Sequence, residues 1–112
     1  MSHDKIRGLN DAFRASIITP NPLGKVYMTA GIQTHGEPFG MRTLVAIASF
    51  DAFTEDIDPH GEHDMIRVVV DDTIVWAKID YYDKADPDLG AEDPSNAATT
   101  ERVMTLMLPE EY

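Results

Sequence analysis

Residues 65–82 have the sequence MIRVVVDDTIVWAKIDYY, and this stretch determines the fold class more clearly than any other. Two segments of it, 65–70 and 73–82, are rich in the β-branched and aromatic residues that favour strands. The pair Asp71-Asp72 between them is a turn signal. The sequence therefore predicts a β-hairpin with a two-residue turn.

That turn sets which residues of the hairpin face each other. Val68 faces Val75 on the core side of the pair. Arg67 faces Trp76 on the opposite side, where we expect a cation–π contact to half-bury the tryptophan. The alternative for Trp76 is an exposed aromatic patch shared with Tyr82, a composition that protein interfaces favour.

The rest of the chain predicts a single α+β domain, residues 1–112, in which two helices pack on a small antiparallel sheet. Apolar residues recur every three or four positions over residues 4–18, which predicts an amphipathic helix capped by Asp4. Residues 101–108 alternate as a strand added to the hairpin sheet would, although a final helix capped at 94–96 is the alternative. The other expected elements are a strand at 25–30, a largely buried helix at 41–53, and loops at 33–40, 54–62 and 83–98.

Negative charge is the most unusual property of the composition. The 112 residues include 20 acidic and 9 basic ones, which gives a formal net charge of −11. Fourteen of the acids but only four of the bases lie in residues 57–112. A field of this sign repels nucleic acid and attracts basic proteins. We therefore expect the C-terminal half to present its surplus charge outward as one continuous face for a basic partner, with no nucleic acid bound directly.

Several classes of site lack their sequence signals. The chain contains no cysteine, which excludes disulfides, thiolate zinc sites and a cysteine nucleophile. There is no Gly-x-Ser-x-Gly elbow, no phosphate-binding loop and no dinucleotide fingerprint, so we expect no cofactor. The apolar runs are too short to span a bilayer, and the first residues lack the apolar stretch of a signal peptide. We therefore expect a cytoplasmic protein with no membrane partner.

Residues 58–64, DPHGEHD, are the densest group of side chains that can bind metal or transfer protons. The hairpin register, when extended, brings His63 opposite Asp80, a carboxylate that can orient an imidazole in a metal site or a general base. The spacing of His60 and His63 matches no known metal signature. Asp, His and Glu beside Pro and Gly commonly bond their own backbone, so a structural turn is the first interpretation. A binding surface and a metal-dependent site are the alternatives.

Several stretches resemble one known family. They are IRGLNDAFR at 6–14, MTAGI at 28–32, FDAFT at 50–54, DPHGEHD at 58–64, KIDYYD at 78–83 and the terminal stretch 102–112. These stretches resemble a family of small bacterial proteins that is catalogued only as a domain of unknown function, is frequent in alphaproteobacteria and is often carried on plasmids. The resemblance implies no activity. It does imply a mobile-element setting, in which small acidic proteins sometimes block restriction or CRISPR machinery.

Three hypotheses for the function follow, and binding is favoured over an enzymatic role. The first is a protein-binding module whose acidic half binds a basic surface of a nucleic-acid-handling protein, as a DNA-mimic-like inhibitor of a restriction or CRISPR-type system. The second is a structural or accessory module that forms homo-oligomers, such as a homodimer through a sheet edge. The third is a small metal-dependent hydrolase that uses His60, Glu62, His63 and Asp80. The residues expected to contact a protein partner are Asp58, His60, Glu62, His63, Asp80, Tyr82, Asp83, Asp86, Asp88, Glu92 and Asp93.

Overall fold

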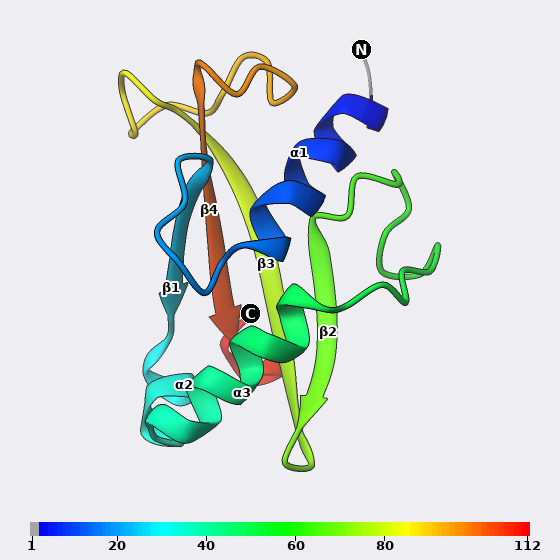
Figure 1. Ribbon diagram of the computed structural model, residues 1–112, viewed down its shortest axis with the longest axis vertical. Coiled ribbons are helices and arrows are strands. Elements are labelled where there is room, and N and C mark those ends of the chain that lie inside the picture. The colour runs from blue at the N-terminus through cyan, green and yellow to red at the C-terminus, as the bar shows by residue number, and fades with distance from the viewer. Residues whose placement is uncertain (1–2) are drawn as a thin grey trace.

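A computed structural model describes residues 3–112 and has the α+β arrangement that the sequence predicts (Figure 1). The helices are α1 (His3–Ala15), α2 (Ala30–Thr34) and α3 (Glu37–Ala48). The strands are β1 (Gly24–Met28), β2 (Met65–Val70), β3 (Thr73–Asp83) and β4 (Thr100–Met107), and the 3₁₀ turn η1 (Pro109–Glu111) follows them.

The hairpin of β2 and β3 has the predicted register, in which Arg67 pairs with Trp76. Asp71 and Asp72 have φ angles of 51° and 66°, and a type I′ turn requires positive φ at both central residues. Aspartate tolerates this left-handed conformation better than most residues do, so the pair forms the turn. Trp76 is half-buried, but the expected contact with Arg67 is wrong, since no cation–π contact within residues 3–112 involves either residue.

The four strands form one sheet in the order β1-β4-β3-β2. β4 runs antiparallel to β3 but parallel to β1, so the prediction of a wholly antiparallel sheet is wrong for β1. The chain reaches this mixed sheet because two helices and a long loop separate β1 from the hairpin and let it lie at the far edge. The segment 101–108 is a strand, as favoured, and its backbone pairs with neighbours on both sides.

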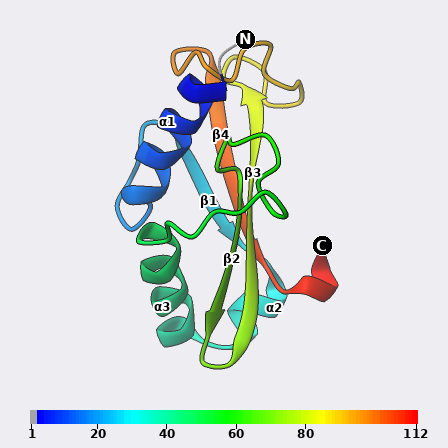
Figure 2. The ribbon, with the colours of Figure 1, turned by 90° about the vertical axis from the view of Figure 1, so that its right-hand side faces the viewer.

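α1 and α3 cover one face of the sheet, and the short 3₁₀ turn η1 lies toward the other face (Figure 2). We call this second face the face without helices, because neither α1 nor α3 packs on it. Alternate strand residues point to the two faces, and most of those facing the helices are apolar and buried. Thr100 and Arg102 of β4 are the buried polar exceptions. The core between the two layers is formed by side chains from every helix and from β2, β3 and β4. Its fully buried members include Phe13, Ile32, Ile47, Ile66, Val75, Ala77, Met104 and Leu106.

The N-terminal helix is shorter than predicted, and the following part of the chain is more helical. α1 ends at Ala15, and Asp4 lies within its first turn instead of at the cap. The strand predicted at 25–30 ends at Met28, because Thr29 caps α2 by accepting a hydrogen bond from the Ile32 N–H. The expected loop at 33–40 contains the end of α2 and the start of α3.

α3 begins and ends earlier than the helix predicted at 41–53. Pro38 lies in its first turn, where a helix needs no N–H donor, so the proline starts the helix and does not break it. The helix is also less buried than predicted, since Met41 and Val45 are about half exposed, at 51% and 50%. Within residues 3–112, no helix is both long enough and apolar enough to cross a bilayer.

Candidate functional site

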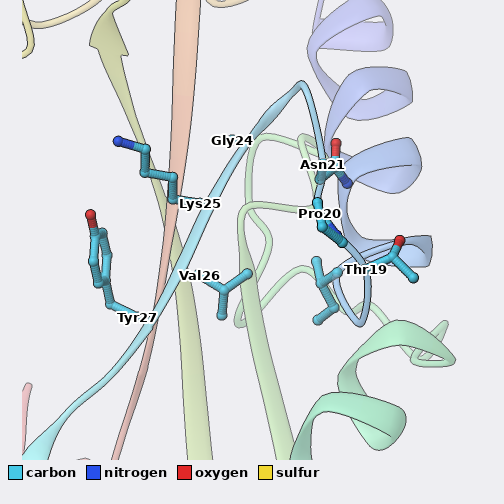
Figure 3. Close-up of a pocket in the computed structure, with 8 residues that line it drawn as sticks. Thr19, Pro20, Asn21, Gly24, Lys25, Val26 and Tyr27 are labelled. Carbon is cyan, nitrogen blue, oxygen red and sulfur yellow. The ribbon is translucent and has the colours of Figure 1, made fainter.

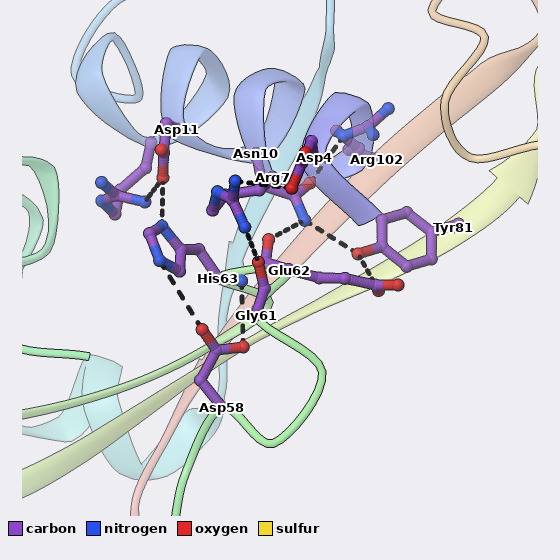
Figure 4. Close-up of polar contacts among 11 residues, drawn as sticks. Asp4, Arg7, Asn10, Asp11, Asp58, Gly61, Glu62, His63, Tyr81 and Arg102 are labelled. Carbon is purple, nitrogen blue, oxygen red and sulfur yellow. Dashed lines mark hydrogen bonds and ion pairs between the residues drawn. The ribbon is translucent and has the colours of Figure 1, made fainter. Parts of the chain in front are cut away.

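The end of the 49–64 loop, which joins α3 to β2, folds against α1 (Figure 4). Gly61 and His63 have φ angles of 67° and 57°, in the left-handed region. At these two residues the backbone leaves the extended conformation, so the segment just before Met65 does not continue the line of β2. One hydrogen bond, from the Ile79 N–H to the Asp64 carbonyl at 2.8 Å, extends the hairpin ladder beyond β2.

His63 lies between two carboxylates. Its Nδ1 is 2.7 Å from Asp11 Oδ1, and its Nε2 is 3.6 Å from Asp58 Oδ2. Asp58 is buried, and its Oδ1 accepts a hydrogen bond from the His63 N–H at 3.0 Å. The imidazole also stacks on Phe53, with 3.7 Å between ring centroids and 2° between ring planes. His63 therefore fastens the loop both to α1 and to the loop's own earlier residues.

The predicted pairing of His63 with Asp80 is wrong for two reasons. The left-handed backbone of His63 takes it out of the extended register and directs its side chain toward α1. Successive side chains of β3 also point to opposite faces of the sheet, so Tyr81 faces the loop and Asp80 lies on the face without helices. Asp80 Oδ1 is there 3.3 Å from Lys78 Nζ.

Asp11 connects His63 to Arg14. Its Oδ1 also accepts a hydrogen bond from Arg14 Nη1 at 2.8 Å. Burial alone raises the pKa of Asp11, but the hydrogen bonds from His63 and Arg14 outweigh burial and hold the pKa below its usual value. The guanidinium carbon of Arg14 lies 5.0 Å from the centre of the Phe53 ring. These contacts form a compact polar and aromatic cluster between α1 and the loop.

Asn10 joins α1 to three other parts of the fold (Figure 4). Its Nδ2 donates to the Glu62 carbonyl at 2.9 Å and to the Tyr81 hydroxyl at 2.8 Å. Its Oδ1 accepts a hydrogen bond from Arg102 Nε at 2.7 Å. Arg102 is 0% exposed and also donates, through Nη2, to the Pro94 carbonyl at 2.6 Å. One amide thus connects a helix, a loop and two strands at the end of the sheet.

Burial controls ionisation in this network. It raises the pKa of Tyr81 well above the usual value, so the hydroxyl keeps its proton and can donate to Glu62 Oε1, 3.5 Å away. Burial lowers the pKa of Arg102, and the nearby Tyr81 and Glu62 oppose that effect. The guanidinium therefore stays charged among neutral partners, with its Nη1 buried and without a hydrogen-bond partner.

The four residues of the hydrolase hypothesis make separate contacts. His60 is exposed and stacks with His3 at 6.0 Å between ring centroids, whereas Glu62 Oε2 is 2.5 Å from His3 Nδ1. His63 binds α1, and Asp80 lies on the other face of the sheet. Within the described residues, no three His, Asp or Glu side chains are placed to hold a metal ion together.

The remaining predicted binding residues lie on or beside the acidic loop, which we define as residues 83–98. The loop is at the end of the sheet opposite the hairpin turn (Figure 1). Backbone hydrogen bonds hold it to the sheet: Asp83 N–H donates to the Leu89 carbonyl at 2.9 Å, and Ala91 N–H to the Tyr81 carbonyl at 3.1 Å. Tyr82, beside this loop, points to the face of the sheet without helices.

The carboxylates of the acidic loop shape its local turns. Asp83 Oδ1 accepts a hydrogen bond from the Ala85 N–H at 2.8 Å, and Asp86 Oδ1 accepts one from the Asp88 N–H at 3.2 Å. Hydrogen bonds from Ser95 lower the pKa of Asp93 below its usual value. The side chains remain at the surface: Asp86, Asp88, Glu92 and Asp93 are all exposed.

The acids of the C-terminal half do not form one continuous face, as the sequence led us to expect. Asp58 is buried, and Asp71 forms an ion pair with Arg42 at the hairpin end of the molecule. Glu111 binds Thr29 Oγ1 and the Gly31 N–H through its two carboxylate oxygens. The acidic loop contains five of the fourteen acids and one of the four bases of this half.

Most residues of this site lie in a part of the chain that matches a known family. The model of the family described as "Protein of unknown function (DUF3768)" matches residues 28–111. The chain belongs to this family. No curated protein and no solved structure matches the chain significantly. The DUF3768 match includes the 49–64 loop, Tyr81, Arg102 and the acidic loop, whereas α1, with Asn10 and Asp11, precedes it.

Asn10 and Arg102 were not identified from the sequence as part of this DUF3768 site. Both are polar residues at positions where the hydrophobic pattern predicts a core residue. Asn10 is four residues after Ile6 and three before Phe13, so it lies on the apolar stripe of α1. Arg102 likewise alternates with Met104 on the core face of β4. A polar residue at a core position needs buried partners, so such positions indicate a buried network.

Asp64 offers a test of the electrostatics at the entry to β2. Burial, followed by repulsion from Glu62 and Asp58, raises its pKa above 3.8, so the folded state resists ionising this group. The resulting penalty is absent below pH 3.8 and appears as the pH rises through the folded-state pKa. Asp64→Asn is therefore expected to raise the unfolding free energy at pH 7, with the gain disappearing toward acid pH. Urea titrations at several pH values check this, and Asp56→Asn, on an exposed part of the loop, should show no such gain.

Proposed function

We propose that the protein is a protein-binding module whose acidic loop binds a cationic surface of a nucleic-acid-handling protein. The supporting observation is the charge of the loop, with five carboxylates and one lysine in residues 83–98. That lysine, Lys84, points its Nζ toward the Ala97 carbonyl, 3.5 Å away, and not toward a carboxylate. Lys5 attracts Asp93 electrostatically, whereas Asp86, Asp88 and Glu92 form no ion pair within residues 3–112. The negative charge of these three residues is therefore available to an external partner.

The loop is also held in place before any partner binds. Its hydrogen bonds to β3, the bridge between Tyr82 and Gly90, and the contact of Arg102 with the Pro94 carbonyl limit its conformations. A surface that is ordered in advance loses less entropy on binding, so more of its interaction energy contributes to affinity. This is the property that a module with a charged recognition loop requires.

The finer proposal is that the carboxylates take the place of DNA phosphates on the target, which we expect to be a restriction or CRISPR-type protein. Surfaces that bind DNA present Lys and Arg to phosphate oxygens, and carboxylate oxygens accept the same charge-assisted hydrogen bonds. The module would then inhibit by competing with DNA for one site. Competition distinguishes this mechanism from binding elsewhere on the target.

The proposal predicts a loop-specific loss of inhibition. DNA cleavage by a panel of restriction endonucleases and CRISPR effectors is measured with increasing amounts of the protein. A triple variant that neutralises exposed acids of the loop should inhibit a sensitive enzyme about tenfold less, because three exposed pairs at about 0.5 kcal/mol each sum to about 1.5 kcal/mol. The triple variant consists of Asp86→Asn, Asp88→Asn and Glu92→Gln.

The matched control changes the net charge by the same amount elsewhere. It consists of Asp51→Asn, Glu55→Gln and Asp56→Asn, all on exposed positions of the 49–64 loop. This control should inhibit as the unmodified protein does. Inhibition should also weaken as salt rises, because exposed charges are screened over about 8 Å at physiological ionic strength. Equal losses in both triple variants, or inhibition that molar salt leaves unchanged, contradict the proposal.

A further inference from the structure

The outer edge of β1 has backbone groups that the sheet does not use. Alternate residues of a strand direct their N–H and C=O groups to opposite sides. The Leu23 carbonyl accepts a hydrogen bond from the Arg102 N–H, and the Thr29 N–H donates to the Leu106 carbonyl, both at 3.1 Å. The odd-numbered residues of β1 therefore face β4, and the N–H and C=O of Val26 point outward.

The two ends of this edge are already occupied by the chain itself. The Gly24 N–H donates to the Asn21 carbonyl at 3.4 Å. At the other end, the Met28 carbonyl accepts a hydrogen bond from Gln33 Nε2 at 2.8 Å. An added strand can thus pair with only a short segment, and that segment is centred on Val26.

A groove of about 550 Å³ runs beside the same edge (Figure 3). The loop between α1 and β1 forms its other wall, with Ile17, Thr19 and Pro20 among the lining residues. In Figure 3 the Val26 side chain points toward this wall, whereas Lys25 and Tyr27 point to the opposite side. The groove therefore has room for a side chain of an added strand on the Val26 side.

Charge favours this edge for the approach of a second copy of the chain. Two copies, each with a formal charge of −11, repel each other least where carboxylates are absent. Residues 12–36, which include β1, contain no acidic residue. The carboxylate of Glu101, on the neighbouring strand β4, lies beside β1 but is paired with Lys25 at 3.8 Å. The other free edge, β2, is flanked by Asp64 on one side and Asp71-Asp72 on the other. Of the two edges of the sheet, β1 is the one that an acidic protein can present to itself.

We propose that a second copy pairs its β1 antiparallel with this edge, with Val26 opposite Val26 of the second copy. The two sheets then join into one, and Lys25 of each copy faces Tyr27 of the other. Both side chains reach the surface, since the Lys25 side chain is 64% exposed and Tyr27 is 54% exposed. Lys25 Nζ also lies 3.8 Å from Glu101 Oε2, so the contact across the interface adds to, or replaces, this long ion pair. A lysine ammonium over a tyrosine ring is a favourable contact, and the symmetry makes it twice.

A charge exchange tests the register of this interface. In sedimentation velocity over a wide range of concentrations, the full chain should pass from 12.5 kDa toward twice that mass. Tyr27→Lys places lysine opposite lysine and should raise the dissociation constant at least about tenfold. Adding Lys25→Glu to that variant pairs opposite charges and should restore dimerisation. A chain that stays monomeric at every concentration, or a double variant that is not restored, overturns the proposal.

Proline provides an independent test of which edge is used. Val26→Pro removes an N–H that points away from the sheet, so it should abolish the dimer without breaking the β1–β4 ladder. Val69→Pro is the matched control, because the bond between Ile79 and Asp64 places the Val69 N–H on the free edge of β2. This control should still dimerise. Loss of the dimer in Val69→Pro alone assigns the interface to β2 and overturns the proposal. If Val26→Pro does not fold, as circular dichroism would reveal, the charge exchange still decides.

Discussion

Replacing Asn10 by alanine is expected to lower the free energy of unfolding by about 3 kcal/mol, because one buried and two partly buried groups lose a hydrogen-bond partner together. Arg102 Nε loses its acceptor, and Nη1 of the same guanidinium already has none. The Glu62 carbonyl and the Tyr81 hydroxyl lose a donor. The guanidinium of Arg102 is the most costly of these, because it keeps only the Pro94 carbonyl as a partner and water cannot replace the amide at a side chain that is 0% exposed.

Urea titration at neutral pH measures this loss, and the transition should move to lower urea with little change in its slope. Asn96→Ala is the matched control. The side chain of Asn96, on an exposed part of the acidic loop, accepts a local hydrogen bond from the Ala98 N–H through its Oδ1. Removing that contact should cost less than about 1 kcal/mol. Equal losses in the two variants would show that the buried network does not stabilise the fold.

A double variant separates the cost of the unpaired charge from the loss of packing. Asn10→Leu with Arg102→Met replaces the polar pair by apolar side chains of similar length. Since no charge is then left buried without a partner, the double variant should recover a large part of the stability that Asn10→Ala loses. An effect of Asn10 that came only from helix packing would not be reversed by changing Arg102.

The hairpin could be predicted residue by residue because its signals are local. The β-branched residues of 65–70 and 73–82 define two strands, and Asp71-Asp72 fits a turn that needs two positive φ angles. The strand β1 could be predicted as an element, but its parallel pairing with β4 depends on how the long connections cross the molecule. The predictions for 25–30 and 33–40 failed in part because Thr29, assigned to the strand, and Pro38, assigned to the loop, lie at the starts of helices here.

The site could be predicted only in composition. The segment 58–64 does contain buried and bonded side chains, as its density of Asp and His suggested. The partners were out of reach, because the positive φ of His63 redirects its ring from β3 to α1, and no residue type announces that change. Asp11 thus takes the role expected of Asp80. Asn10 and Arg102, by contrast, are polar residues on apolar stripes, a pattern that is visible in the sequence.

Gly24→Ala is expected to destabilise the fold by about 3 kcal/mol or more, because the added methyl has no space. A Cβ at this position would lie 2.1 Å from the carbonyl oxygen of Arg102 and 2.7 Å from the carbonyl carbon. Both atoms belong to the backbone of β4, which is paired on both sides and cannot move without loss of the ladder. The start of β1 must therefore separate from β4, and the main chain of Arg102, whose side chain holds the buried network, moves with it.

Gly8→Ala tests the same exchange where the opposite result is expected. Gly8 is exposed in the middle of α1, and a Cβ there would meet nothing within 4 Å. Alanine should stabilise the helix by about 0.5 to 1 kcal/mol, since glycine loses more backbone entropy on folding. Thermal unfolding of both variants should thus give shifts of opposite sign. If Gly24→Ala is as stable as the unmodified protein, the close approach of β1 to Arg102 is not what fixes this edge of the sheet.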